Sequence, residues 1–402
     1  MFSAFRNRDY LLYWLGAAVS FTGSWVQSVC HGWLVYDITD SELWLGLVGF
    51  FGALPTSGLT LFGGAIADRV NKRHALIFTQ SMFAVFAAIL GVLVQTGTVT
   101  KYHIIVIAFL QGFITAVDAP MRHSMPAVLV KKDNLMNAIA LNSAAFNSAR
   151  IIGPAVAGLL VANFSMALCF YLNAASYLAV IIALLLIKTR TPAKPKSGAS
   201  VFIDIADGLR YIKQEKRILN LMLVLAVSSL FVMPYVTLIP VFAKDILKMG
   251  IEANAKLLTS IGIGAVVGSL LLAGLSHLPS RARILIVSSA IGGVMLIAFA
   301  NSEHLLLSQI ILIGLGFSVV SFNQTTNTLI QGVTDDAYRG RVMSVYVFTF
   351  MGLSPLANLQ AGVLAHTLGA PLTVTLWGFI FLSLSVFILL KLPVFNYEKC
   401  NH

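Results

Sequence analysis

The sequence predicts an all-α membrane protein with twelve transmembrane helices. Its composition is 58% hydrophobic and only 11% charged, with a mean hydropathy of +0.86. A soluble chain of 402 residues needs far more polar surface than this. The sequence also contains twelve apolar stretches, each close to the roughly 20 residues that cross a bilayer. The net charge of +11 comes from basic residues in short loops, which favours lipid headgroups over nucleic acid as their partner.

The twelve expected spans fall into two groups of six. The first group is expected near residues 10–36, 44–66, 74–96, 102–121, 137–163 and 166–187. The second group is expected near residues 218–243, 254–278, 283–300, 304–328, 340–365 and 370–391. The pattern predicts an N-terminal six-helix half over residues 1–187 and a C-terminal six-helix half over residues 218–402. Two such halves are expected of a duplicated transporter.

The polar break at residues 188–217 predicts a linker between the halves. Its first part, around residues 191–198, is rich in Pro and Lys and predicts a flexible segment. Residues 201–216 then place Phe202, Ile205, Leu209 and Ile212 on one helical face, with basic residues as the complement. This segment predicts a short amphipathic helix that lies on the membrane surface.

The distribution of basic residues predicts the orientation of the chain. If the N-terminus is inside, the outer loops hold only Lys101, Lys244, Lys248 and Lys256, and the inner segments hold nearly all other Lys and Arg residues. Positive charge is retained on the cytoplasmic side, so both termini are expected to be cytoplasmic. The first apolar segment is too long and too polar for a signal-peptide core, so we expect it to remain as a span.

A charged turn at residues 64–73 separates the second and third expected spans. It holds Gly64, then Asp68 and Arg69, and then a basic cluster that ends at Lys72 and Arg73. We expect the three basic side chains to meet anionic headgroups on the cytoplasmic side. Asp68 is expected at the end of its helix, where it can stabilise the N-terminus of a neighbouring helix.

This turn resembles the signature between helices two and three of the major facilitator superfamily of transporters. The resemblance implies a gate in which Asp68 holds the start of helix eleven when the cytoplasmic side is closed. Residues 5–10, 33–36 and 208–212 are similar to the branch that includes bacterial enterobactin exporters and macrolide efflux proteins. The resemblance covers essentially the whole chain. It implies an exporter of the bacterial cytoplasmic membrane that works by alternating access.

The fifth expected span carries Arg150 followed by Gly153, Pro154 and Gly158. Pro154 removes a backbone donor and bends the helix, and the glycines permit close helix contact. The segment resembles the helix-five motif of exporters in the superfamily, which favours efflux over uptake. A charge at this depth needs a partner or water. Arg150 is therefore either an anchor for an anionic substrate or a brace bonded to neighbouring carbonyls.

Asp118 and Arg122 lie four residues apart and are expected to pair at the cytoplasmic end of the fourth span. This segment resembles the same region of the superfamily and predicts a structural ion pair at the inner gate. All acidic residues are expected near helix ends or in loops, so the sequence assigns no carboxylate to proton coupling. Many proton-driven exporters in the superfamily carry an arginine three residues before a Gln-Gly pair in helix four, and this chain has Gln111 and Gly112 but Ala108 at that position.

His31 is the titratable candidate inside a span, because histidine changes charge near neutral pH. Gln27 lies one turn away on the same face, and Asp37 lies near the outer surface. Each is either a proton or substrate site or a hydrogen-bonded packing residue. Further candidates for the wall of a substrate pocket are Asn147, Asn323, Tyr235 and Tyr346, because polar groups are costly against lipid.

These patterns predict a secondary active transporter that exports an amphipathic small molecule, such as a siderophore or drug, with proton coupling. The alternatives are a lipid, nutrient or metabolite transporter on the same fold, including uptake, and a membrane receptor that transports nothing. No nucleotide-binding loop, nucleophile elbow or zinc-type histidine pair is present, so the sequence predicts neither an enzyme nor a cofactor or metal site. The expected partners are the substrate, a proton and the lipid bilayer, with no nucleic acid, and we expect a monomer.

Overall fold

The computed structural model describes residues 3–189, 201–274 and 281–391, and within these ranges it does not describe the side chains of residues 60–69, 201–206 and 273. The described residues form helices and no strand. The chain divides into two compact units. Unit 1 holds residues 1–40, 51–197 and 249–259, and unit 2 holds residues 41–50, 198–248 and 260–402.

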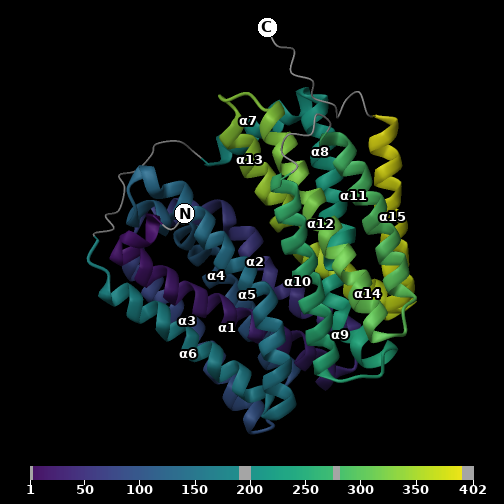
Figure 1. Cartoon of the computed structure of the whole chain (residues 1–402), viewed down its shortest axis with the longest axis horizontal. Helices are drawn as coiled ribbons and strands as arrows, with labels where there is room; N and C mark the ends of the chain where they lie inside the picture. The colour runs from purple at the N-terminus through teal and green to yellow at the C-terminus, as the bar shows by residue number, and fades with distance from the viewer. Residues whose placement is uncertain (1–2, 190–200, 275–280, 392–402) are drawn as a thin grey trace. The chain divides into compact units, whose positions relative to one another are not determined.

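Unit 1 is built from six long helices, coloured purple to teal in Figure 1. They are α1 (Arg8–Thr39), α2 (Glu42–Arg69), α3 (Lys72–Gln95), α4 (Lys101–Leu129), α5 (Leu135–Asn163) and α6 (Met166–Leu186), with the first turns of α2 counted in unit 2. α6 packs against both α1 and α3, and α1 also packs against α5. α3 packs against α4, so α1, α3, α4 and α6 enclose the interior of this unit.

Local sequence fixes where several of these helices begin. The Asn7 side chain accepts hydrogen bonds from the backbone N–H groups of Asp9 and Tyr10, and Asn71 caps α3 in the same way. Thr100 and His103 form a reciprocal capping box at the start of α4. These caps satisfy backbone donors that a helix N-terminus otherwise leaves unpaired.

Unit 2 contains helices that are less regular than those of unit 1. Its first helical segment after the linker is α8 (Lys216–Val227), which continues through the π-helical turn η3 (Ser228–Val232), the 3-10 turn η4 (Met233–Leu238), α9 (Ile239–Val241) and the π-helical turn η5 (Phe242–Ile246). Its others are α10 (Ile251–Gly274), α11 (Arg281–Ala300), α12 (Leu305–Val333), α13 (Arg339–Val347), the π-helical turn η6 (Phe348–Gly352), α14 (Ser354–Leu368) and α15 (Ala370–Leu390). The first turns of α10 belong to unit 1. α11 packs against α12 and α15.

The linker helix α7 (Val201–Gln214) packs on α13 within unit 2. The Tyr211 ring stacks on Tyr338 with centroids 4.3 Å apart, and its hydroxyl donates to Asp335 over 3.0 Å. Arg341 lies 3.7 Å from the Asp207 carboxylate. The described part of the amphipathic helix is therefore fixed by specific contacts with protein.

Ten helical segments of the described residues are long and apolar enough to cross a membrane. They run from α3 to α6 and from α8 to α15, and the joined segments α8 to η5 and α13 to α14 each count once. α1, with 32 residues, and α2, with 28 residues, fall outside this set. The all-helical membrane fold is confirmed, and the count of twelve spans and the location of the termini stay predictions.

Candidate functional site

Asp118 lies well away from both ends of α4, and its side chain is buried. It lies about 25 Å from the first residue of α4 and about 16 Å from the last, at a rise of about 1.5 Å per residue. Only 5% of its surface is exposed. The expectation that every acid lies near a helix end or in a loop is therefore wrong for Asp118.

The reason for this error lies in the two prolines that follow Asp118. Pro120 and Pro126 suggest a helix end near residue 121, yet α4 continues to Leu129. Pro126 cannot donate to the carbonyl of Arg122 one turn earlier. The Tyr13 hydroxyl donates to that carbonyl over 3.1 Å instead. A neighbouring helix thus satisfies the group that the proline frees, so the helix persists.

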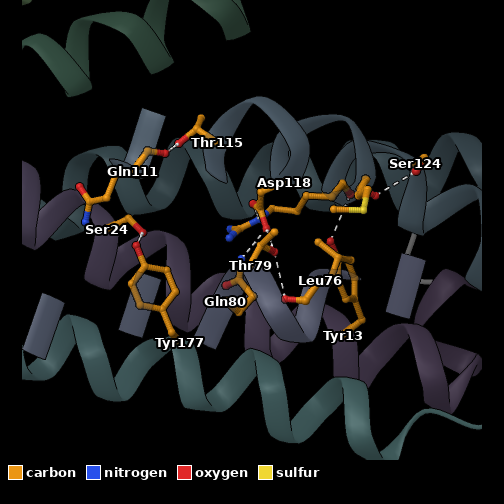
Figure 2. Close-up of polar contacts among 12 residues, drawn as sticks. Tyr13, Ser24, Leu76, Thr79, Gln80, Gln111, Thr115, Asp118, Ser124 and Tyr177 are labelled. Carbon is orange, nitrogen blue, oxygen red and sulfur yellow. Dashed lines mark hydrogen bonds and ion pairs between the residues drawn. The ribbon is translucent and has the colours of Figure 1, made fainter. Parts of the chain in front are cut away.

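Three side chains hold the Asp118 carboxylate, and Figure 2 labels two of them, Thr79 and Gln80. Thr79 Oγ1 and Gln80 Nε2 of α3 donate to its Oδ1 atom over 2.6 Å and 2.8 Å. Arg122 Nε donates to its Oδ2 atom over 3.1 Å, so the ion pair expected from the four-residue spacing is present. Each of these contacts stabilises the charged form of the carboxylate.

Arg122 connects this network to α1. Its guanidinium carbon lies 5.2 Å from the centroid of the Phe21 ring, within the range of a cation–π contact. Removing either member of a buried ion pair leaves an uncompensated charge, at a cost of about 3–5 kcal/mol. Asp118 and Arg122 are therefore expected to act as one unit.

One cavity of unit 1, the α6-side cavity, has a volume of about 320 Å³. Its walls are Ser24, Gln27, Ser28 and His31 of α1, Phe83 of α3, Gln111, Thr115, Asp118 and Arg122 of α4, and Asn173 and Tyr177 of α6. Asn173 Nδ2 donates to Gln27 Oε1 over 2.7 Å, and the Ser24 and Tyr177 hydroxyls lie 3.2 Å apart. The structure thus brings the predicted residues Gln27, His31, Asp118 and Arg122 around one polar space.

A second cavity, the α5-side cavity, has a volume of about 330 Å³. Its walls are Phe21 of α1, Asp118, Ala119, Arg122, His123 and Pro126 of α4, and Ile139, Asn142, Ser143, Phe146 and Asn147 of α5. The cavity combines aromatic rings with amide, hydroxyl and charged groups. Asp118 and Arg122 line both cavities. This ion pair therefore lies where two differently lined spaces meet.

Arg150 lies on α5 beside an aromatic group from α1. Its guanidinium carbon is 5.9 Å from the centroid of the Trp25 ring, and that ring contacts Phe146 with centroids 6.1 Å apart. Gly153 and Pro154 are buried one turn further on, and a Cβ on Gly153 would collide with Trp25. Gly158 lies near Ala255. These contacts bring α5 close to α1 and to the first turns of α10.

The remaining predicted residues lie apart from this site. Asp37 is exposed and lines neither cavity. Tyr235, Asn323 and Tyr346 are buried in unit 2. Asn323 Nδ2 lies 3.6 Å from the sulfur of Met233. Their place in a substrate pocket stays a prediction.

The charged turn is only partly described. The side chains of Gly64, Asp68 and Arg69 lie outside the described residues, so their gate role is untested. Lys72 is buried, which contradicts its expected exposure to headgroups. Arg73 donates to the carbonyl of Leu185 over 2.8 Å and so ties α3 to the end of α6.

Sequence reasoning missed several polar residues of the site, among them Thr79 and Gln80 on α3 and Asn173 and Tyr177 on α6. Each pair interrupts a long apolar stretch, and Asn173 and Tyr177 are one helical turn apart. Polar groups in an apolar span are expected to face the interior. Their partners, however, lie on other helices. No three His, Cys, Asp or Glu side chains group as a metal site anywhere in the described residues.

The helices that are long and apolar enough to cross a membrane and the buried polar interior define a multi-pass membrane protein. A family model described as transmembrane secretion effector matches residues 1–402, so the chain belongs to this family of the major facilitator superfamily. The family predicted from the charged turn is thereby confirmed. The protein is a multi-pass protein of the bacterial cytoplasmic membrane.

Curated relatives match over nearly the whole chain. The staphyloferrin A transporter of Staphylococcus aureus is 28% identical, with 95% of this chain and 96% of the relative covered. The multidrug efflux pump Tap of Mycolicibacterium fortuitum is 25% identical, with 97% and 96% covered. Among solved structures, a POT family transporter in complex with 5-aminolevulinic acid superposes with a TM-score of 0.78 at 12% identity, covering 97% of each chain. That similarity shows the fold.

Proposed function

We propose that this protein exports an amphipathic small molecule by alternating access, with Asp118 as the carboxylate that couples transport to protons. The observation that carries the proposal is the buried Asp118–Arg122 pair, which borders two cavities at once. Ionisable residues inside a membrane protein are costly and mark ion or substrate pathways. In the described part of the chain, Asp118 is the one carboxylate that is fully buried.

Protonation of Asp118 gives the site two distinct states. In the charged state, Thr79, Gln80 and Arg122 all donate to the carboxylate. In the protonated state, the attraction to Arg122 is lost and the guanidinium is free to turn toward either cavity. A substrate group that donates a hydrogen bond to Asp118 competes with the proton, and this mutual exclusion is the requirement for antiport.

The lining of the α5-side cavity supports an amphipathic substrate. Phe21 and Phe146 offer aromatic surface, while Asn142, Ser143 and Asn147 offer hydrogen-bonding groups. Binding sites for small molecules typically combine apolar walls with a few polar groups that fix orientation. The relatives named as a staphyloferrin A transporter and a multidrug efflux pump support substrates of this kind. Asp68 fits this cycle as the latch of the cytoplasmic gate.

Transport into proteoliposomes under an imposed pH gradient tests this function. Siderophores, macrolides and lysolipids serve as test compounds. We expect wild type to move at least one of them, and Asp118→Asn to lose gradient-driven transport at least tenfold. The matched control is Asp133→Asn, because Asp133 is an exposed acid in the turn after α4 and lines neither cavity.

Two outcomes contradict the proposal. Equal gradient-driven transport by Asp118→Asn and wild type would remove Asp118 from coupling. Failure of wild type to move any test compound in either direction would overturn the exporter assignment. Asp68→Asn tests the gate separately, and we expect it to lose transport while the protein still inserts in the membrane at the wild-type level.

A further inference from the structure

We infer that protons reach Asp118 through the α6-side cavity, along a route separate from the α5-side cavity that takes the substrate, with His31 as the titratable group of that route. This inference rests on the proposed function, because it assumes that Asp118 exchanges protons during transport. Its structural basis is that Asp118 and Arg122 are the two residues common to both cavity walls. A proton and a substrate can therefore approach the same ion pair from different sides.

The α6-side cavity has the chemistry of a proton route. Nearly all of its lining residues carry a polar side chain, and Phe83 is the exception. A water molecule takes up about 30 Å³ in the liquid, so a cavity of about 320 Å³ has room for several hydrogen-bonded waters. Along its wall, the Ser24 and Tyr177 hydroxyls hydrogen-bond each other. The Asn173 amide donates to the Gln27 amide.

The polar residues of α1 extend along this cavity in a continuous row. Ser24, Gln27 and His31 are spaced by about one helical turn each, so the row spans about 10 Å at a rise of about 1.5 Å per residue. Gln111, Thr115 and Asp118 form the matching row on α4. Two facing rows of hydroxyl and amide groups provide the donors and acceptors that a chain of waters needs.

His31 marks a position on the route where a proton can rest. Its side chain lines the α6-side cavity, and its Nε2 atom is buried and meets no hydrogen-bond partner among the described residues. The titratable or charged residues that face Asp118 are Tyr13 and His31 of α1, Arg122 and His123 of α4, and Tyr177 of α6. α3 and α5 present neutral groups only, namely Thr79 and Gln80 on α3 and Asn142, Ser143 and Asn147 on α5. His31 is therefore the imidazole that lines the α6-side cavity, and its two ring nitrogens can donate and accept hydrogen bonds.

The α5-side cavity is poorly suited to proton conduction. Phe21, Pro126, Ile139 and Phe146 supply much of its wall and break the polar surface into patches. The same groups favour contact with the apolar part of an amphipathic molecule. The contrast between the two linings assigns the proton to one cavity and the substrate to the other.

The experiment follows the protonation of Asp118 directly and needs no substrate. Purified wild type in detergent is subjected to a rapid drop in pH, and the carboxylic acid band of Asp118 is recorded by infrared difference spectroscopy. Asp118→Asn identifies the band, because it removes this carboxyl group. If no band is lost in this variant, Asp118 does not titrate, and the coupling role in the proposed function fails independently of the route.

The route is tested by two variants in the α6-side cavity and one in the α5-side cavity. Gln111→Leu and His31→Gln interrupt the α6-side cavity, and we expect each to slow the appearance of the band at least tenfold while its final size stays unchanged. Ser143→Leu narrows the α5-side cavity, and we expect it to leave the rate at the wild-type value. His31→Gln keeps a polar side chain, so it serves as the second variant where Gln111→Leu does not fold.

Two results overturn the route. If both α6-side variants protonate at the wild-type rate, the α6-side cavity does not conduct the proton. If Ser143→Leu slows the band as much as the α6-side variants do, protons also pass through the α5-side cavity and the two routes are not separate. In either case Asp118 still titrates, so the proposed function survives while the separate route is rejected.

Discussion

The interiors of the two units differ in charge and in helix regularity. In unit 1, helices without π-helical turns hold the Asp118–Arg122 ion pair. The two charged residues classed as buried in the described chain, Lys72 and Asp118, both lie in unit 1. In unit 2, buried polar residues such as Asn323, Thr325 and Thr326 are neutral. The π-helical turns η3, η5 and η6 all lie in unit 2. The ion-coupling chemistry is therefore expected in unit 1.

The difference has a physical basis. A buried charge needs partners at fixed distances, and regular helices hold Thr79, Gln80 and Arg122 around Asp118. Irregular helices instead leave backbone carbonyls without their usual donors, and neutral amides satisfy them. Gln360 Nε2 of α14 donates to the carbonyl of Leu230 in η3 over 2.7 Å. π-Helical turns occur frequently at functional sites, so unit 2 offers an adaptable surface.

The strongest test of this comparison concerns stability in unit 1. Arg122→Gln leaves the Asp118 carboxylate buried without its countercharge, so we expect a loss of about 3–5 kcal/mol in the free energy of unfolding. The double variant Asp118→Asn with Arg122→Gln removes both charges, and we expect it to recover most of that stability. Thermal unfolding of the purified proteins in detergent measures both effects. A double variant as unstable as Arg122→Gln alone would show that charge balance is not what unit 1 maintains.

The second test concerns the close contact of α1 and α5 that supports the same interior. A methyl group on Gly153 would collide with the Cβ of Trp25 and lie 3.2 Å from the carbonyl oxygen of Thr22. We expect Gly153→Ala to lower the free energy of unfolding by about 1–3 kcal/mol, as overpacking does. Gly158→Ala is the matched control, because its nearest neighbour is the Ala255 methyl at 3.0 Å. Equal effects of the two variants on the unfolding temperature would contradict this explanation.

The third test addresses the irregular segment of unit 2. Gln360→Leu removes the side-chain donor to the Leu230 carbonyl, so we expect a loss of about 1 kcal/mol in the free energy of unfolding. Gln324→Leu is the matched control, since Gln324 is exposed and donates to Ser269 on the helix surface. Hydrogen exchange at residues 228–232 should rise in the first variant and stay unchanged in the second. Unchanged exchange in both would show that Gln360 does not stabilise η3.

The sequence predicted the helices and the local pairs but not the depth of the site. The spacing of Asp118 and Arg122 predicts their ion pair, because it depends on one helix alone. The depth of Asp118 was mispredicted because the support that Tyr13 gives to the helix beyond Pro120 comes from α1. Thr79 and Asn173 were missed for the same reason, since their partners are 39 and 146 residues away in the sequence. Contacts between helices are not encoded in local spacing.

The smallest expected effect concerns Asp9, which precedes the first span and links the start of α1 to the end of α6. Its Oδ2 atom accepts hydrogen bonds from the backbone N–H groups of Lys188 and Thr189, over 3.0 Å and 2.8 Å, and from Thr189 Oγ1 over 2.7 Å. Partial burial raises the pKa of Asp9, but these hydrogen bonds and the nearby Arg8 charge outweigh it, so the pKa lies below its ordinary value of 3.8.

Because the pKa of Asp9 is lower in the folded state, the stabilisation that its hydrogen bonds provide is sensitive to acid. This stabilisation is fully present above the ordinary pKa of 3.8 and is lost as the pH falls through the lower pKa of the folded state. Asp9→Asn removes this dependence, so its unfolding temperature should fall less than that of wild type as the pH drops below about 4. Asp133→Asn, at an exposed acid, should follow the wild-type curve. If wild type and Asp9→Asn show the same pH dependence, the contact between α1 and the end of α6 depends on packing. The Asp118–Arg122 ion pair is then the main electrostatic contribution to the stability of unit 1.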